Sequence, residues 1–213
     1  LILNPDIVCE KNYFENLKFY LNSELDFSII GSQYLDNNTH APAGFFDSDL
    51  SLKDADHMQD LNLSKVDWVV GCSILIDLKK FSNKNLFDEN FFLFYEETDF
   101  CRKVKLDNGS TFSSKDLIID HYGEQGSFAN QEEGKYSYLK LRNWHLMWSS
   151  FYYYKKNYSY NYAFRLLIGS LMKSFFKTIF FAMILNKYNC IKHLYRFLGL
   201  INSMIGKKSW FRV

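Results

Sequence analysis

Two stretches of this sequence decide its fold: VDWVVGCSILI at residues 66–76 and FDENFFLFYEETDFC at residues 87–101. The first is rich in β-branched and apolar residues and predicts a buried strand, interrupted at Gly71 where another group must come close to the backbone. The second is an aromatic run that leads into four residues containing three acids. A helix is expected from there to Lys105, because Phe100, Cys101 and Val104 are apolar at helical spacing.

Weaker patterns on either side predict the rest of an α/β domain. Residues 1–8 are expected to form a buried strand that ends at Asn4-Pro5-Asp6, because proline and short polar side chains stop a strand. A helix is expected over residues 12–25, with Phe14, Leu17, Leu21 and Leu25 on its apolar face. The remaining expected elements are a strand at 27–30, a long polar loop with one weak helical or hairpin piece at 32–63, a helical turn at 78–81, a helix end at Asn108-Gly109 and a last short strand at 117–119.

Length and cysteine content place the chain in a broad class. A chain of 213 residues can bury one good core, with room for an appendage. The four cysteines form no CxxC pair, which indicates free thiols in a reducing compartment. The sequence opens with Leu1 inside an apolar stretch, and we therefore expect it to be a piece of a longer protein.

Charge divides the chain sharply. All 24 acidic residues lie within residues 1–133, together with 11 Lys and Arg, whereas residues 134–213 contain 14 Lys and Arg and no acid. Such asymmetry indicates a polyanionic partner for the tail, either nucleic acid or an anionic membrane surface.

Three places carry side chains suited to chemistry, and each has a structural alternative. Asp6 follows an expected strand and could hold a divalent cation, although an Asp after Pro more often serves a turn. Glu96, Glu97 and Asp99 could oppose the helix dipole or, at the rim of an apolar core, include a general base. His121 could be structural or could join a metal held by an aspartate.

The order and spacing of these segments resemble a known family. The segments LNPD at 3–6, VDWVVGCSILI at 66–76, FDENFFLFYEETDFC at 87–101 and IDH at 119–121 resemble successive motifs of family 2 glycosyltransferases with a GT-A fold. The resemblance is to the rhamnosyltransferase and galactofuranosyltransferase-like branch, and it covers roughly residues 1–150. It implies an incomplete GT-A mixed sheet, with the N-terminal nucleotide-binding half missing and amphipathic helices following.

The resemblance also implies roles for individual residues. Asp6, with Asn4 beside it, matches the metal- and donor-binding aspartate, and His121 matches a histidine that joins the metal in some members. Glu97 stands where the family usually has the aspartate that deprotonates the acceptor, with Glu96 and Asp99 as its acidic neighbours. The acceptor side is implied to be formed by Trp68, Gly71 and Asp99.

The implied enzyme is an inverting hexosyltransferase of bacterial surface glycan synthesis. It would use Mg²⁺ or Mn²⁺, a nucleotide-sugar donor carrying a rhamnose-like sugar, and a lipid-linked or polysaccharide acceptor; this piece alone is expected to be inactive. The alternative is a non-catalytic, membrane-associated binding subunit, which the Glu97 departure keeps open. A metal-dependent hydrolase would need more His and Asp ligands than Asp6 and His121 provide.

The tail has three readings: a membrane-associating helix, a nucleic-acid surface, or helices packed on the catalytic domain or on a second copy in a homo-oligomer. In a helix expected over residues 163–185, Arg165, Lys173 and Lys177 share about a third of the circumference, away from Leu167 and Leu171. The longest uncharged run there, residues 178–186, is short for a membrane span. We therefore expect residues 1–150 to be the transferase part, residues 151–213 to lie peripherally on the cytoplasmic face of the bacterial inner membrane, and no nucleic-acid partner.

Overall fold

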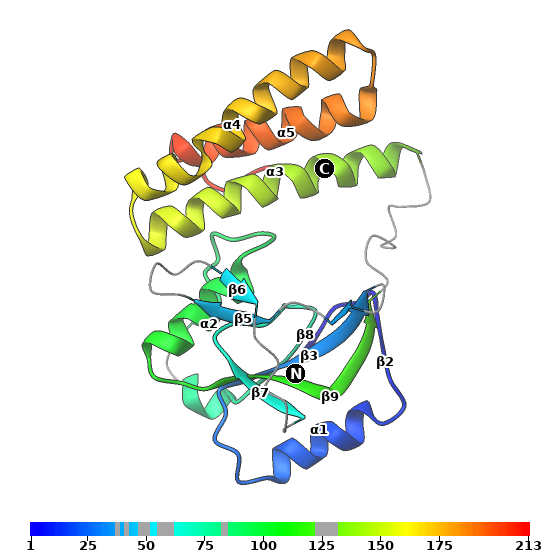
Figure 1. Ribbon diagram of the computed structural model, residues 1–213, viewed down its shortest axis with the longest axis vertical. Helices are drawn as coiled ribbons and strands as arrows, with labels where there is room; N and C mark the ends of the chain where they lie inside the picture. Colours follow the sequence, from blue (N-terminus) through cyan, green and yellow to red (C-terminus); the bar gives the residue numbers. More distant parts are fainter. Residues whose placement is uncertain (37–38, 41–42, 47–51, 55–61, 82–84, 122–131) are drawn as a thin grey trace. The chain divides into compact units, whose positions relative to one another are not determined.

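The computed structural model describes residues 1–36, 39–40, 43–46, 52–54, 62–81, 85–121 and 132–213 (Figure 1). The chain forms two compact units: residues 1–87 with 97–126, and residues 88–96 with 127–213. The first unit holds the β-strands and the second is helical, so the prediction of a mixed α/β protein is confirmed. The boundary expected at residue 150 falls inside one helix, because residues 132–157 are continuous.

A mixed sheet organises the first unit. In the described part of the chain its strand order is β1-β8-β3-β9-β2, with β4 beside β3 and β7 beside β9; only β3 and β9 run parallel. A separate hairpin joins β5 to β6. The strands are β1 (Ile2–Leu3), β2 (Ile7–Cys9), β3 (Ile29–Asp36), β4 (Thr39–His40), β5 (Gly44–Phe46), β6 (Leu52–Asp54), β7 (Leu63–Val66), β8 (Ser73–Ile76) and β9 (Thr111–His121).

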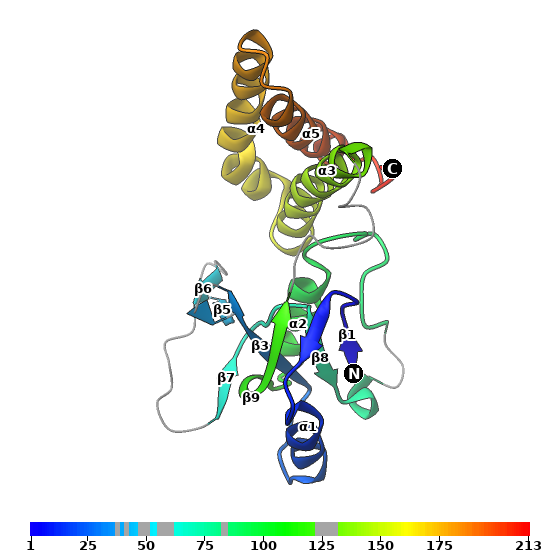
Figure 2. The same cartoon turned by 90° about the vertical axis from the view of Figure 1, so that its right-hand side faces the viewer.

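Two helices cover opposite faces of this sheet (Figure 2). Successive residues of a strand point to opposite faces, so Ile29 packs with α2 (Glu96–Leu106) and Ile30 packs with α1 (Tyr13–Asn22). On the α2 side, Phe100, Cys101 and Val104 are buried, as their spacing predicted. The helical turn at η1 (Leu78–Phe81) and the helix end at Asn108-Gly109 are likewise confirmed.

Helix α1 forms where expected, but its predicted apolar face is right at Leu17 and wrong at Phe14 and Leu21. The buried residues are Tyr13, Leu17 and Tyr20, whereas Phe14 and Leu21 are more than half exposed. The reason is that the two tyrosines bury their rings and satisfy their hydroxyls: the Tyr13 hydroxyl bonds Ser73 Oγ at 2.6 Å and the Tyr20 hydroxyl donates to Asp116 Oδ2 at 3.0 Å. A count of purely apolar residues misses such a face.

The strand predictions need three corrections. The expected buried strand at residues 1–8 is two short strands, and Ile2 and Leu3 in β1 are 40% and 38% exposed, because β1 is an edge strand. Residues 66–76 do not form one strand: β7 pairs with β9 and β8 with β3, so residues 67–72 connect the two. Strands β3 and β9 are longer than expected. The loop expected at 32–63 begins with the end of β3 and contains the β5–β6 hairpin, one of the two alternatives expected there, and much of the rest lies outside the described residues.

The second unit contains three long helices: α3 (Glu132–Asn157), α4 (Tyr160–Met183) and α5 (Lys187–Met204). Helix α5 packs against both others (Figure 1). At the contact with α3, Gly199 lies so close that a Cβ there would meet the carbonyl oxygen of Trp144 at 2.1 Å. The C-terminal segment returns to α3, where Trp148 donates to the carbonyl of Lys207 at 2.9 Å.

Helix α4 is the most exposed apolar element. Of the described helices, it alone has the length and composition to cross a membrane, and only 6% of its most apolar window is buried. Length and composition alone therefore do not exclude a crossing helix, because the 18-residue window of α4 that has a mean hydropathy of 1.5 holds at most two charged residues.

Candidate functional site

The start of α2 lies against the segment that joins β7 to β8. A Cβ built on Gly71 would sit 3.3 Å from both Cβ and Cγ of Glu97, so the glycine leaves room for this side chain. The close approach that the sequence predicted at Gly71 is confirmed, and the approaching group is the candidate general base. Glu97 is partly buried, which places a carboxylate at the rim of the core.

The segment Asn4–Asp6 reaches the same place from the edge of the sheet. Strand β1 pairs with β8, and the backbone N–H of Asn4 donates to the backbone carbonyl of Cys72 at 2.9 Å. Cys72 is the residue after Gly71. Burial, together with the nearby carboxylates of Glu97 and Asp6, raises the pKa of the Cys72 thiol to about 11. Both carboxylates therefore lie within electrostatic reach of one buried sulfur.

The backbone also brings His121 to this region. Strand β2 pairs antiparallel with β9 in a register that sets Ile7 opposite His121, so the histidine's backbone neighbours the residue after Asp6. The direction of the His121 side chain lies outside what the structure describes. The parts of the chain around Asp6, Gly71, Glu97 and His121 thus come together in the first unit.

The other acids of the predicted set are placed differently. Asp99 is only 1% exposed, and its carboxylate lies 3.8 Å from the Lys103 ammonium one turn along α2. Glu96 belongs to the second unit; burial raises the pKa of its carboxyl, and within the described residues its Oε2 has no hydrogen-bond partner. Of the three acids, Glu97 is the one whose contact with Gly71 places it with Asn4–Asp6.

Trp68 lies in the core of the first unit. It is 9% exposed and packs in the cluster that contains Phe46 and Val69, while its backbone bonds to Gly44. Its indole Nε1 is buried, and none of the residues described here accepts its hydrogen bond. The predicted contact of Trp68 with an acceptor stays a prediction, since both its ring and its Nε1 are buried.

The donor set for a metal is small. Within the described ranges, no group of three or more His, Cys, Asp or Glu side chains is close enough to hold an ion. Asp6 is half-buried and Asn4 is exposed, and both lie in the turn between β1 and β2. Magnesium is commonly held by one or two carboxylates plus substrate phosphates, and such a set fits that mode of binding.

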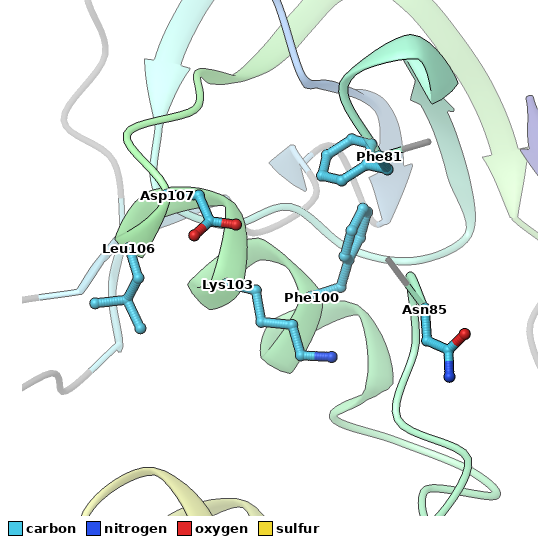
Figure 3. A pocket seen from close by; sticks show the side chains of 6 residues that line it. All are labelled: Phe81, Asn85, Phe100, Lys103, Leu106 and Asp107. Carbon is cyan, nitrogen blue, oxygen red and sulfur yellow. The ribbon is translucent and has the colours of Figure 1, made fainter. Parts of the chain in front are cut away.

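A separate hollow of about 170 Å³ lies along the second half of α2 (Figure 3). Its walls are Phe81, Asn85, Phe100, Lys103, Leu106 and Asp107. The rings of Phe81 and Phe100 lie next to each other with centroids 5.2 Å apart. None of the eight residues predicted for the site lines this hollow, so the two places do not coincide.

Sequence reasoning missed two features of the region. One is Cys72, whose position next to Gly71 in the segment 66–76 was the available signal. The other is the backbone before α2, where Phe94 and Tyr95 have φ angles of 67° and 70°, a left-handed conformation that is strained for bulky residues. Within the second unit this loop is fixed by α3, since Ser149 donates to the carbonyl of Leu93 at 2.7 Å and Tyr95 to Ser150 Oγ at 3.3 Å.

Comparison with known proteins points in one direction. The chain is 27% identical over 150 residues to the low-salt glycan biosynthesis hexosyltransferase Agl10 of Haloferax volcanii, a match that covers 67% of this chain and 48% of that protein. The chain therefore spans about half the length of the relative it matches. No family model matches the chain, and no solved structure does.

The similarity agrees with the general class of enzyme that the sequence motifs suggested. The name of the relative describes a hexosyltransferase of glycan biosynthesis, which is one kind of glycosyltransferase. The match does not identify family 2, the GT-A fold or the rhamnosyltransferase branch. The chain is thus similar to a glycosyltransferase in sequence and has a mixed α/β first unit in structure.

Proposed function

We propose that this chain is part of an inverting glycosyltransferase that moves a sugar from a nucleoside diphosphate sugar to a hydroxyl group of a glycan or lipid-linked acceptor. The observation that carries the proposal is the similarity to a hexosyltransferase over 150 residues. The convergence of Asn4–Asp6, Gly71 and Glu97 in the first unit supports a place for the chemistry. The finer assignment, to the GT-A, family 2 group and its rhamnosyltransferase-like branch, rests on the motif resemblance.

Glu97 is the proposed general base. Its carboxylate takes the proton of the acceptor hydroxyl as the acceptor oxygen forms a bond to the anomeric carbon of the donor sugar. The bond from that carbon to the diphosphate oxygen breaks at the same time, and the nucleoside diphosphate leaves with the electron pair. A single displacement of this kind inverts the anomeric configuration. Gly71 keeps the space into which the Glu97 side chain extends.

Asp6 is the proposed anchor for the donor's diphosphate, with Asn4 beside it. A Mg²⁺ or Mn²⁺ ion held there by Asp6, with His121 as a second ligand, would stabilise the charge that develops on the leaving diphosphate. The chain's own contribution is the position of Asp6, fixed through the Asn4–Cys72 hydrogen bond at the end of β1. The described residues would supply few ligands to such an ion, so oxygens of the donor phosphates would complete its coordination shell.

The test is a pair of carboxamide variants in the full-length protein. Glu97→Gln should lower sugar transfer by at least about a thousandfold while donor binding persists, since the amide keeps the shape and removes the base. The control is Glu15→Gln, an exposed acid in the first turn of α1, which should transfer at the native rate. Transfer is followed by product formation from a panel of nucleotide sugars, and donor binding by calorimetry.

The outcomes separate the enzyme from the alternative. Unchanged turnover in Glu97→Gln would remove Glu97 from the role of base. If the native protein binds donor or acceptor but transfers nothing from any donor of the panel, the chain is better described as a glycosyltransferase-like binding subunit. Asp6→Asn gives a further check, because it should weaken donor binding in the presence of Mg²⁺ or Mn²⁺ more than in its absence.

A further inference from the structure

Helix α4 presents an exposed apolar stripe within the second unit. The stripe consists of Leu166, Met172, Phe176, Phe180 and Met183, which are between 45% and 71% exposed. At 100° per residue these positions fall within about a third of the helical circumference. The opposite side of α4 is used for packing, since Ala163 and Leu167 are buried with Phe151 and Leu200. The stripe is therefore additional to the surface that holds the three helices together.

The turn between α4 and α5 extends the stripe with a strained apolar tip. Leu185 is 90% exposed and has a φ angle of 55°, a left-handed conformation that favours glycine at this position after a helix. Ile184 beside it is 53% exposed. A leucine at this place adds backbone strain and gains no packing within the described chain. An apolar medium around the tip would explain why a leucine stands at this exposed and strained position.

Cations accompany the stripe, without acids on the same helices. Arg165 and Lys173 fall on the same third of α4 as the apolar side chains, and Lys177 lies at its edge, while residues 134–213 contain no Asp or Glu. This positive charge also affects the pKa of His193, a buried residue of α5. Burial and the nearby cations Lys177, Arg196, Lys192 and Lys173 together lower the pKa of His193 to about 4.

We propose that the stripe and the tip bind the interface of an anionic lipid bilayer, with the apolar side chains among the headgroups and upper acyl chains and the cations at the phosphates. The charge of this part of the chain selects a lipid surface over an apolar face of another protein. Residues 134–213 contain 14 Lys and Arg and no acid, and such a positive charge is attracted most strongly to a polyanion such as an anionic bilayer. The inference is independent of the proposed transferase activity, since lipid binding needs no sugar donor.

The cations within α4 favour a position of this helix at the bilayer interface over one in which it crosses the bilayer. Lys173 is in the middle of the helix and Lys177 one turn further on, so a span would draw both into the hydrocarbon region, where charges are costly. Helix α5, which packs along α4, carries Lys192 and Arg196 and would follow it.

The experiment is vesicle co-sedimentation of the full chain with vesicles of phosphatidylcholine alone and of phosphatidylcholine with phosphatidylglycerol. The native protein should sediment with the anionic vesicles and be released by high salt. Lys173→Gln with Lys177→Gln should weaken binding about 30-fold, since each lysine near an anionic surface strengthens it about fivefold. Phe180→Ser with Leu185→Gly should weaken binding at least about tenfold by removing inserted apolar surface.

Matched controls lie in the first unit. Phe19→Ser with Leu106→Ser removes two apolar side chains that are 70% and 68% exposed, and Lys18→Gln with Lys79→Gln removes two exposed lysines. Both control variants should bind anionic vesicles like the native protein. Leu185→Gly alone should unfold at the same or a higher urea concentration, so a loss of lipid binding in that variant is not a loss of fold.

Three results would overturn the proposal. The first is no sedimentation with either vesicle. The second is equal binding to both vesicles that resists high salt, which would indicate a helix that crosses the bilayer. The third is binding to RNA that the lysine variants abolish, with no binding to vesicles, which would make the tail a nucleic-acid surface.

Discussion

Gly71 and Glu97 are in direct contact: a Cβ placed on the glycine would lie 3.3 Å from Cβ and Cγ of the glutamate and 3.4 Å from its Cδ. The contact joins the connection between β7 and β8 to the first turn of α2. An added methyl group would fit only if the Glu97 side chain moved by a few tenths of an ångström. Such a shift would affect the position of the proposed base more than the packing of the core.

Gly71→Ala should therefore lower the rate of sugar transfer with little loss of stability. We expect kcat to fall at least about tenfold, because small displacements of a catalytic group are costly, and the free energy of unfolding to change by less than about 1 kcal/mol. The control is Gly169→Ala in α4, where no heavy atom lies within 4 Å of the added Cβ. That variant should transfer normally and gain about 0.5–1 kcal/mol of stability, since alanine favours a helix over glycine. A native kcat in Gly71→Ala would show that Glu97 is not the group whose position matters.

The loop before α2 should make the second unit sensitive to acid through Asp88. Burial alone would raise the pKa of Asp88, but hydrogen bonds from Lys156 and from Asn90 outweigh it and lower the pKa to about 2. Because the folded pKa is depressed, the stabilisation is complete above the unfolded value near pH 4 and is lost as the pH falls towards 2. The shift corresponds to about 2 kcal/mol.

Asp88→Asn tests this linkage. At pH 7 the variant should lose about 2 kcal/mol of unfolding free energy, and the difference from the native protein should shrink between pH 4 and pH 2. Urea denaturation at a series of pH values gives both numbers. Asp26→Asn removes the partner of Lys80, an exposed carboxylate, and should change stability by less than about 1 kcal/mol at any pH. A difference between native and Asp88→Asn that is independent of pH would contradict the assignment.

The sequence was most informative where a single residue type allowed only one physical explanation. A glycine within an apolar segment indicated close approach at Gly71, and acids followed by Phe100, Cys101 and Val104 indicated α2 and its buried face. It was least informative about strand pairing. Nothing in residues 66–76 shows that Val66 pairs with Thr111 while Ser73 pairs with the edge strand β1, because pairing depends on segments far away in the chain. The continuous strand read from apolar content was therefore two strands.

The site was predictable as a set of segments and not as a set of contacts. The turn at Asn4–Asp6 and the acids at 96–99 were recognisable from the sequence. The burial of Asp99 beside Lys103 and the position of Cys72 near two carboxylates follow from the sheet register and the helix rotation. Neither has a local signature.

Helix α1 allows a direct test of its apolar face, which the sequence predicted correctly at Leu17 and wrongly at Leu21. Leu17 is 9% exposed and packs with Phe27 and Ile30, whereas Leu21 is 54% exposed on the same helix. Leu17→Ala should cost about 3 kcal/mol of unfolding free energy, and Leu21→Ala less than about 1 kcal/mol. Chemical denaturation of the two variants compares the same substitution at two positions one turn apart. Equal losses would mean that the apolar spacing, and not the tyrosine face, describes the packing.

The close contact between α3 and α5 makes Gly199 the most restrictive position of the second unit. A Cβ at this residue would lie 2.1 Å from the carbonyl oxygen of Trp144 and 2.9 Å from its carbonyl carbon, so the two helix backbones would have to separate. Separation would also loosen Leu200 from Phe151, both fully buried. Gly199→Ala should therefore cost about 3 kcal/mol or more, against the gain expected when alanine replaces glycine in an open helix, as at Gly169. Thermal and urea unfolding of the two alanine variants measure both signs, and a Gly199→Ala protein as stable as the native one would place α5 further from α3 than the structure has it.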